Sequence, residues 1–379
     1  MLDGHSEMTP SRDVRAGFDR PELPLIVVSA VALVSGGPLT ILRQAVEAAR
    51  ASGDANFLFL VHDAGSWEES GNVRFLSFPL ARRSYLRRLS TEYRRFPKLS
   101  RRWRPDVWLS LHDVTPPVTA RRQAVYCHNP LPYWKPTLRD LRLHPFEVVR
   151  SFLYGFVYRT FARRNDFVIG QLPWFTEFMG RYMGVPRERL VVVAPRAGAP
   201  GAVVEEAPAR GDGLLECLYA SLPRVFKNFE EAIDLCDQPG VRLTVTLSGD
   251  ENRYARWVRA YARRRGDVAF AGLLSHEDTL AAMARSDVVL FPSRLETFGL
   301  PVQEAIDLGR TLVLPLRPWT VAVAGEYPRA HFYRTVEQGR RILEALRRGE
   351  EPPGVRPHVP ESDLPRLSGF EELYPFLLR

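Results

Sequence analysis

Short apolar runs alternate with longer segments along most of the chain. In the first half, apolar runs of strand length lie at 25–31, 57–61, 107–111, 124–127, 167–169 and 190–193. Segments of helical length separate several of them, at 39–51, 85–102, 146–163 and 174–183. Buried strands that alternate with helices are typical of a parallel sheet covered on both faces. The first half therefore predicts an α/β domain.

The alternation stops once and then begins again. Ala, Gly and Pro supply 11 of the 18 residues at 196–213, which is typical of a linker. Beyond it, strands are predicted at 214–219, 243–247, 268–271, 288–291 and 311–314, and helices at 229–235, 253–265, 276–284, 301–308 and 335–348. We expect two Rossmann-like, doubly wound domains at 22–196 and 214–350, a linker at 197–213, and a Pro-rich tail with a terminal segment at 351–379. Ligands of such sheets bind beyond the carboxyl ends of the strands, so the expected site is the cleft between the domains.

Length and composition agree with a two-domain globular protein. The chain has 379 residues, 45% of them hydrophobic and 25% charged, and domains hold roughly 100–200 residues each. No apolar run reaches the roughly 18 residues that cross a bilayer, and the first 22 residues are polar, unlike a signal peptide. We expect a cytoplasmic protein. The three cysteines, Cys127, Cys217 and Cys236, are far apart and lack metal-ligand spacing, so we expect buried free thiols.

The positive charge is concentrated in one segment. The net charge is +8, and residues 82–104 hold nine Arg and one Lys against a single acid, Glu92. Aromatic and aliphatic residues recur there every three or four positions, which indicates an amphipathic helix, although Pro97 would kink it or end it. Two interpretations stay open. The segment could dock on an anionic inner membrane leaflet, or it could be a solvated basic face.

One segment carries most of the candidate chemistry. A buried strand ends at Phe291, a turn follows, and a helix opens with Pro301 in its first turn, where the missing N–H costs nothing. The free N–H groups of a helix start attract an anion such as a diphosphate. Gly299 permits the backbone to approach the ligand closely. Glu296 and Glu304, eight positions apart, could bind hydroxyl groups on either side of the phosphate. A capped helix with two solvated glutamates would give the same pattern.

This segment resembles the E-x7-E signature of retaining GT-B glycosyltransferases of the group called family 4. Glu296 and Glu304 have the required spacing, and Phe298, Gly299 and Leu300 begin the Phe-Gly-Leu-Pro sequence common between them. The resemblance implies that Glu296 lies near the donor sugar and Glu304 binds the nucleotide ribose. It also implies a nucleoside diphosphate sugar as donor substrate, with neither a metal nor another cofactor, and the chain contains no Asp-x-Asp metal motif.

Other glycine and basic residues fit the same resemblance. Lys227 precedes a predicted helix at the start of the second domain, where family members place a lysine on the diphosphate. The family's arginine five positions earlier is replaced by Leu222, and whether Arg224 substitutes for it is open. Gly36 and Gly37 follow the first strand, where family members keep a glycine-rich loop near the phosphates or the acceptor, although an ordinary strand–helix turn would look alike.

Residues at two strand ends and one turn complete the predicted site. His128 and Asn129 belong to a His-Asn-Pro segment similar to one in O-antigen and other polysaccharide-assembly transferases, which implies that His128 contacts the transferring sugar. Asp113 also ends a strand and is a second candidate on the acceptor side. Gly272 and Leu273 resemble the turn whose backbone reads the nucleotide base. Lone polar residues of this kind are also common as purely structural groups.

The sequence thus predicts a retaining hexosyltransferase in polysaccharide or glycan biosynthesis, with a saccharide or lipid-linked acceptor. A GT-B epimerase or phosphorylase is an alternative, although no segment resembles a phosphorylase's pyridoxal phosphate lysine. A non-catalytic GT-B scaffold would leave Lys227, Glu296 and Glu304 without a role. A basic nucleic-acid-binding protein is the remaining alternative, but no nucleic-acid module is recognisable, and we expect no nucleic-acid partner.

Overall fold

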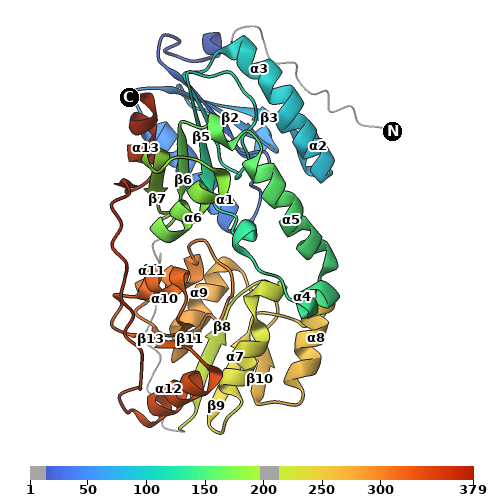
Figure 1. The fold of residues 1–379 in the computed structure, drawn as a ribbon, viewed down its shortest axis with the longest axis vertical. Coiled ribbons are helices and arrows are strands. Elements are labelled where there is room, and N and C mark those ends of the chain that lie inside the picture. Colours follow the sequence, from blue (N-terminus) through green and yellow to red (C-terminus); the bar gives the residue numbers. More distant parts are fainter. Residues whose placement is uncertain (1–13, 197–212) are drawn as a thin grey trace. The chain divides into compact units, whose positions relative to one another are not determined.

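The structure, a computed structural model, describes residues 14–196 and 213–379, which divide into two compact units (Figure 1). Among these residues, unit 1 holds 14–129, 154–196 and 363–379, and unit 2 holds 130–153 and 213–362. The sequence placed 130–153 in the first domain and 351–379 in a tail, so the structure divides the chain differently at both places. The predicted linker at 197–213 lies, apart from Gly213, outside the described residues.

Unit 1 is built on an eight-stranded, all-parallel sheet in the order β14-β7-β6-β5-β4-β1-β2-β3. Its strands are β1 (Leu25–Ser29), β2 (Asn56–Val61), β3 (Val73–Ser77), β4 (Val107–Ser110), β5 (Arg122–Cys127), β6 (Phe167–Gly170), β7 (Leu190–Val193) and β14 (Arg366–Leu367). The central strands are buried at every position, because helices cover both faces. The predicted α/β class is confirmed for this half.

The helices of unit 1 form two cores, one on each face of the sheet. They are α1 (Gly36–Ala51), α2 (Tyr85–Ser90), α3 (Phe96–Trp103), α6 (Pro173–Met183) and α13 (Phe370–Leu378), with short turns η1 (Arg15–Gly17), η2 (Ala64–Ser66), η3 (Pro79–Arg82), η6 (Ala162–Arg164) and η7 (Arg187–Arg189). The C-terminal helix α13 packs on α1, where Tyr374 donates a hydrogen bond to the carbonyl of Ala45 at 2.8 Å. The apolar end of the chain is therefore a core element of unit 1.

The basic segment forms one continuous helical stretch with a π-helical turn in its middle. That turn, η4 (Thr91–Arg95), joins α2 to α3. Pro97 lies in the first turn of α3 and is tolerated there, because a first-turn residue needs no intrahelical N–H partner. Phe96, Leu99 and Trp103 are buried in a core of unit 1. The apolar side of this helix therefore packs on the protein's own sheet.

Unit 2 is built on a six-stranded, all-parallel sheet in the order β10-β9-β8-β11-β12-β13. Its strands are β8 (Leu215–Tyr219), β9 (Val241–Val245), β10 (Asp267–Phe270), β11 (Val288–Leu290), β12 (Thr311–Pro315) and β13 (Ala330–Tyr333). Numbered within the unit, the order is 3-2-1-4-5-6, that of a dinucleotide-binding Rossmann sheet. The second predicted α/β domain is confirmed.

Helices again cover the sheet of unit 2 (Figure 1). They are α4 (Leu138–Leu143), α7 (Phe229–Cys236), α8 (Arg253–Ala262), α9 (His276–Arg285), α10 (Leu300–Asp307), α11 (Pro318–Ala324) and α12 (Val336–Arg348), with short turns η5 (Leu131–Tyr133) and η8 (Val225–Lys227). A further helix, α5 (Pro145–Arg159), begins in unit 2 and ends in unit 1. No helix within the described ranges is long and apolar enough to cross a membrane. Cys127, Cys217 and Cys236 are free and buried, as predicted.

Ion pairs attach the segment 130–153 to unit 2. Asp140 caps α4 together with Thr137 and receives both guanidinium nitrogens of Arg294, at 2.7 and 3.2 Å. Arg139 forms an ion pair with Glu230 on α7. These partners are more than 90 residues away in sequence, so no local pattern indicates that this segment leaves the first domain.

Candidate functional site

The switch point of the unit 2 sheet lies between β8 and β11, where the order of the strands reverses. The connections that follow these two strands diverge to opposite faces, which leaves an open place beyond their carboxyl ends. Lys227 lies in the connection after β8, and Glu296 lies in the connection after β11. The topology therefore brings together two residues 69 positions apart that the sequence had predicted separately.

Lys227 and Glu296 form an ion pair at this place. Their side chains are 16% and 14% exposed, so both are mostly enclosed but reachable from solvent. The Lys227 ammonium also lies 5.3 Å from the ring centre of Phe291, a favourable cation–π distance. The pair presents a fixed positive charge beside a carboxylate that can accept hydrogen bonds.

Hydrogen bonds hold the two connections in register. Tyr219, the last residue of β8, donates to the Lys227 carbonyl at 2.6 Å. The backbone N–H of Arg294 donates to the Phe226 carbonyl at 2.8 Å, and the Asn228 side chain donates to the Pro292 carbonyl at 3.3 Å. Because backbone atoms make these contacts, the positions of Lys227 and Glu296 are set before any ligand arrives.

Gly299 shapes the start of α10. Its φ of 82° is in the left-handed region, where residues with a Cβ are strained. A Cβ built there would lie 2.9 Å from the ring of Trp319, so the backbone approaches the indole closely. Pro301 occupies the first turn, and Gly299 has no side chain to cover the helix start. The N–H groups of Val302 and Gln303 donate to the Gly299 carbonyl, so what the N-terminus of α10 offers an anion is mainly the positive end of the helix dipole.

Glu304 lies inside α10 and is largely buried, with 11% of its side chain exposed. Burial raises its pKa above 4.5; the nearby His276 opposes this shift, and Asp307 adds to it. His276, the first residue of α9, places Nδ1 3.9 Å from Glu304 Oε1. A buried carboxyl group with few protein partners is suited to hydrogen-bond the hydroxyls of a ligand.

The other residues predicted to bind the donor substrate lie in connections of the same unit. Phe298 is buried and Leu300 is half-buried, both beside Gly299. Gly272 has a φ of 79° in the connection after β10, and Leu273 next to it is 77% exposed. Arg224 is exposed and directly precedes η8, three residues before Lys227. The connections after β8, β10 and β11 all leave the carboxyl edge of the sheet, the expected ligand edge.

The predicted acceptor-side residues lie together in unit 1. Asp113 follows β4 with a φ of 65° and accepts hydrogen bonds from the backbone N–H groups of His128 and Asn129, at 2.7 and 2.8 Å. Its other oxygen lies 3.7 Å from His128 Nε2. Asp113 is buried. Its observed role is to hold the end of β5, so that His128 and Asn129 keep one orientation.

Gly36 and Gly37 begin α1, three residues before the predicted start of that helix at residue 39. Gly36 has a φ of 60°, which a residue with a side chain would adopt only under strain. These glycines and the Asp113–His128 group belong to unit 1, whereas Lys227, Glu296 and Glu304 belong to unit 2. The predicted residues are thus divided between the two units, and the contacts among them are the Lys227–Glu296 pair in unit 2 and those of Asp113 with His128 and Asn129 in unit 1.

Sequence reasoning missed a buried polar network at the switch point of unit 1. Ser29 ends β1, and its hydroxyl lies 3.2 Å from Nε2 of His112, which follows β4. Glu92 lies 2.9 Å from His112 Nδ1 and receives Arg88 Nε at 3.0 Å. Burial alone would raise the pKa of Glu92, but Arg88 and His112 lower it below 4.5. The sign of this network in the sequence was that Glu92 is the single acid within the basic segment 82–104.

Other polar residues missed in unit 2 support its connections. Asn252 caps α8 and donates to the Pro223 carbonyl at 2.7 Å, which braces the connection that carries Lys227. Arg317 caps α11 and lies 3.8 Å from Glu231. His276 faces Glu304, as described above. None of these residues belongs to a recognisable motif, and their partners are distant in sequence.

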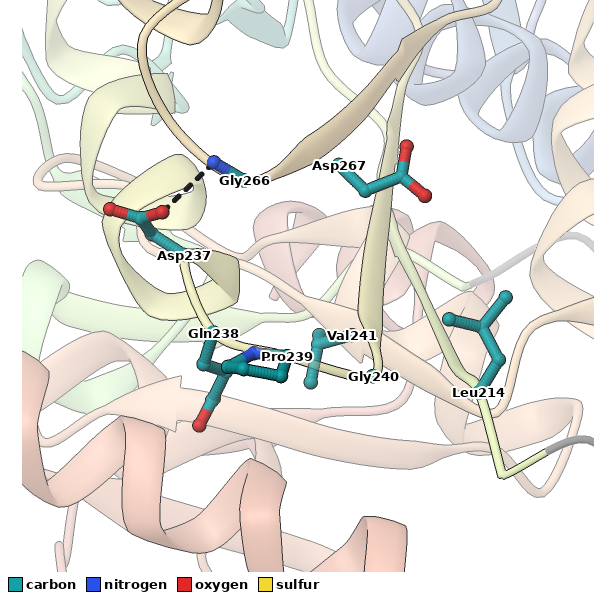
Figure 2. A pocket seen from close by; sticks show the side chains of 8 residues that line it. All are labelled: Leu214, Asp237, Gln238, Pro239, Gly240, Val241, Gly266 and Asp267. Atoms are coloured by element: carbon teal, nitrogen blue, oxygen red, sulfur yellow. Dashed lines mark hydrogen bonds between the residues drawn. The ribbon is translucent and has the colours of Figure 1, made fainter.

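A surface hollow of about 420 Å³ lies at the opposite edge of the unit 2 sheet (Figure 2). Leu214, Val241 and Asp267 line it, at the amino ends of β8, β9 and β10. Asp237 and Gly266 also line it, and the Asp237 carboxylate accepts a hydrogen bond from the Gly266 N–H at 2.9 Å. Ligands of parallel sheets bind at the carboxyl edge, so this hollow is not the candidate site.

Comparison with protein families gives two matches that cover most of the chain. Residues 36–196 match the model of a glycosyl transferase 4-like domain. Residues 221–328 match the model of glycosyl transferases group 1. The first range contains the Asp113–His128 group, and the second contains Lys227, Glu296 and Glu304. No curated protein matches the chain in a search of whole sequences.

Comparison with solved structures shows the same two-domain fold. WaaG, a glycosyltransferase involved in lipopolysaccharide biosynthesis, is 15% identical with a TM-score of 0.62, over 85% of this chain and 90% of that chain. Sucrose-phosphate synthase from Thermosynechococcus elongatus is 15% identical with a TM-score of 0.60, over the same shares. The lipopolysaccharide outer core galactosyltransferase WaaB is 13% identical with a TM-score of 0.58, over 94% of each chain. At these identities the likeness concerns the fold.

Proposed function

Because the chain is a glycosyltransferase of the GT-B fold, we propose that it is a retaining enzyme that takes a hexose or deoxyhexose from a nucleoside diphosphate sugar. The acceptor is a saccharide or a lipid-linked saccharide in glycan biosynthesis. One observation carries the proposal: Lys227 and Glu296 form an ion pair beyond the carboxyl ends of β8 and β11. That pair sits where a Rossmann sheet of this strand order binds nucleotides.

The donor's diphosphate binds at Lys227 and the start of α10. Its negative charge replaces Glu296 as the nearest partner of the Lys227 ammonium, and the positive dipole end of α10 completes the anion site. Glu304 binds the ribose hydroxyls, since its buried carboxyl group is in the same helix. Leu273, largely exposed beside Gly272, supplies an apolar surface for the base. No metal and no separate cofactor takes part.

The chemical step exchanges one bond at the anomeric carbon for another. The bond from that carbon to the diphosphate oxygen breaks, the acceptor hydroxyl oxygen bonds to the carbon, and its proton goes to the departing phosphate. Lys227 and the α10 start stabilise the charge that develops on the diphosphate, often the largest catalytic contribution. Glu296, freed from Lys227, orients the sugar. This front-face route retains the configuration of the donor.

The class of acceptor follows from two of the structural relatives. WaaG is described as involved in lipopolysaccharide biosynthesis and WaaB as a lipopolysaccharide outer core galactosyltransferase. Their likeness to this chain supports a saccharide or lipid-linked acceptor in the assembly of a glycan.

Ligand-induced stabilisation tests the donor assignment. UDP, GDP, dTDP, ADP and their sugars are added to the full chain, and the melting temperature is followed. A ligand at about 100 times its Kd stabilises the native state by about 2.7 kcal/mol, or roughly 5–10 °C for a domain of this size. One nucleotide series should give this shift, and Lys227→Met should remove it. Equal shifts in Lys227→Met and in Arg341→Gln, an exposed control on α12, would contradict the proposal.

Product analysis tests the stereochemistry. With the donor that stabilises the protein, NMR of the transferred sugar should show the anomeric configuration of the donor. Inversion would contradict the retaining assignment while leaving glycosyl transfer intact. Conversion of the donor without an acceptor would instead favour an epimerase.

A further inference from the structure

Helix α5 carries an exposed apolar stripe. Phe146, Val149, Phe152, Leu153 and Phe156 are each between 53% and 76% exposed. Their spacing places them on one side of the helix, within a sector of roughly 120°. Scattered exposed apolar residues are ordinary, but five on one helix face form a continuous patch of the kind that marks an interaction surface.

The opposite side of α5 is buried and packs against the rest of the protein. Val148, Ser151, Tyr154 and Tyr158 are buried, and so is Glu147, which forms an ion pair with Arg150. A helix that is apolar on two opposite sides has more apolar surface than the fold uses. The exposed stripe therefore needs a second environment, and its aromatic side chains would bury a large area there.

The charges around the stripe have one sign. From 130 to 164, all of which the structure describes, the sequence has only two acids, Asp140 and Glu147, and both are buried in ion pairs. The exposed charged residues in the same range are all basic: Lys135, Arg139, Arg142, Arg159, Arg163 and Arg164. Arg139 is paired with Glu230, and the other exposed charges of this segment are unopposed within it, so an apolar stripe on a basic segment matches a surface that is apolar inside and anionic outside.

Helix α2 adds to the same surface in unit 1. Tyr85 and Tyr93 pack against Tyr154 and Phe161, with ring centres 5.3 and 6.0 Å apart, so the α2–η4 stretch lies beside the end of α5. Leu86 on α2 is 77% exposed. Arg83 and Arg87 flank it and are exposed too. The predicted basic segment therefore supplies cations to this border, while the apolar residues of α3 are buried in the core.

We propose that the exposed face of α5, bordered by the arginines of α2 and the 135–164 segment, docks on an anionic lipid surface. The aromatic and aliphatic side chains enter the boundary between headgroups and acyl chains, and the arginines bind lipid phosphates. A second copy of this chain is a poorer occupant, because it would bring the same unbalanced positive charge to the interface. This inference does not depend on the identity of the donor sugar.

Vesicle binding of the full-length protein tests the inference. Sedimentation with vesicles of phosphatidylcholine alone is compared with vesicles that contain about 30% phosphatidylglycerol. The protein should bind the anionic vesicles, and Phe152→Ser/Phe156→Ser should weaken binding at least about tenfold, because two large apolar side chains are removed from lipid. Both positions are exposed, so the melting temperature should not fall. Arg83→Gln/Arg87→Gln should weaken binding to the anionic vesicles.

Matched variants test whether vesicle binding needs this surface in particular or any exposed apolar or basic side chain. Leu222→Ser removes another exposed apolar side chain, and Arg334→Gln/Arg341→Gln removes two other exposed cations. Both should bind vesicles like the native protein. Equal losses in these variants, or native-like binding by Phe152→Ser/Phe156→Ser, would overturn the inference. So would a native dimer in solution that Phe152→Ser/Phe156→Ser converts to monomer.

A fluorescent label tests insertion rather than adhesion. The three native cysteines are buried, so Val149→Cys gives one accessible thiol for an environment-sensitive dye. On anionic vesicles its emission should shift to the blue and be quenched by lipids labelled in the acyl chain. Binding without either change would show that the charges alone hold the protein, and the proposed apolar insertion would be wrong.

Discussion

The two sheets share one strand order but use their switch points differently. In unit 2, the connections after β8 and β11 hold Lys227 and Glu296 within reach of solvent. In unit 1, the corresponding strands β1 and β4 lead to Ser29 and His112, which are buried. The topology supplies a place beyond the strands in both units. The side chains decide whether that place receives a ligand or is filled by the protein itself.

The charged groups at the two switch points also differ in how many partners they have. Glu92 and His112 are buried, and Arg88 and His112 both contact Glu92 Oε1, so removal of one member leaves a buried polar group without its partner. The Lys227–Glu296 pair has only two members and lies partly open, so an incoming diphosphate can replace one partner. The first network fixes the fold of unit 1, whereas the second pair is available for chemistry.

The largest expected effect is on stability in unit 1. Glu92→Leu leaves the mostly enclosed Arg88 and the buried His112 without their carboxylate partner and should cost about 3–5 kcal/mol. Hydrogen exchange of the β1 and β4 amides measures this, because it reports the opening free energy of unit 1. Glu92→Leu/Arg88→Met should recover much of the loss. If both variants keep native protection, the network is not structural and the contrast between the two units is mistaken.

The next effect is on turnover at the unit 2 site. Lys227→Met should lower kcat/KM for the donor about 10²–10³-fold, because charge on the departing diphosphate loses its stabilising cation. Steady-state kinetics measure the change, and circular dichroism checks that the fold is kept. Lys227→Arg should retain part of the activity, since it keeps the charge. Full activity in Lys227→Met would remove the central catalytic role from this pair.

A backbone change at the same site should have a moderate effect. Gly299→Ala places a Cβ at a φ of 82° and 2.9 Å from Trp319, and strain of this kind costs about 1–3 kcal/mol. The melting temperature should fall and donor affinity should weaken together. Gly349→Ala is the matched comparison, because Gly349 also has a positive φ but its Cβ would meet open space. Equal losses in both variants would show that the approach to Trp319 is unimportant.

The smallest predicted effect concerns pH. Burial raises the pKa of Glu304 above 4.5. Folding therefore favours the protonated carboxyl group, which stabilises the native state at low pH. This stabilisation is lost as the pH rises through the raised pKa. A ribose hydroxyl donates best to the carboxylate, so nucleotide affinity should fall by up to about tenfold as pH drops below that value. Calorimetric titrations across this range measure it. Glu304→Gln should flatten the profile; an unchanged profile would place the ribose elsewhere.

Much of the fold was predictable because it depends on local pattern. Continuous apolar runs marked most strands of both sheets, and Pro301 and Gly299 marked the start of α10. The pairing of Lys227 with Glu296 was not visible in either segment alone, although each residue was predicted to contact the nucleoside diphosphate sugar. It follows from the adjacency of β8 and β11, which is a property of the topology.

What the sequence could not show depends on contacts between distant residues. The attachment of 130–153 to unit 2 rests on Asp140–Arg294 and Arg139–Glu230, which have no local signal. Likewise, periodicity showed that 82–104 has an apolar side but not whether that side meets lipid or core. The structure buries Phe96 and Trp103 in the core. The exposed stripe on α5 was predicted only as part of a helix.

A crystal structure with a bound nucleoside diphosphate tests the central claim most directly. The account predicts the diphosphate beyond the carboxyl ends of β8 and β11, in contact with Lys227 Nζ and at the N-terminus of α10, with the ribose at Glu304. A diphosphate bound in the hollow at the amino ends of β8, β9 and β10, with the Lys227–Glu296 pair intact, would contradict it.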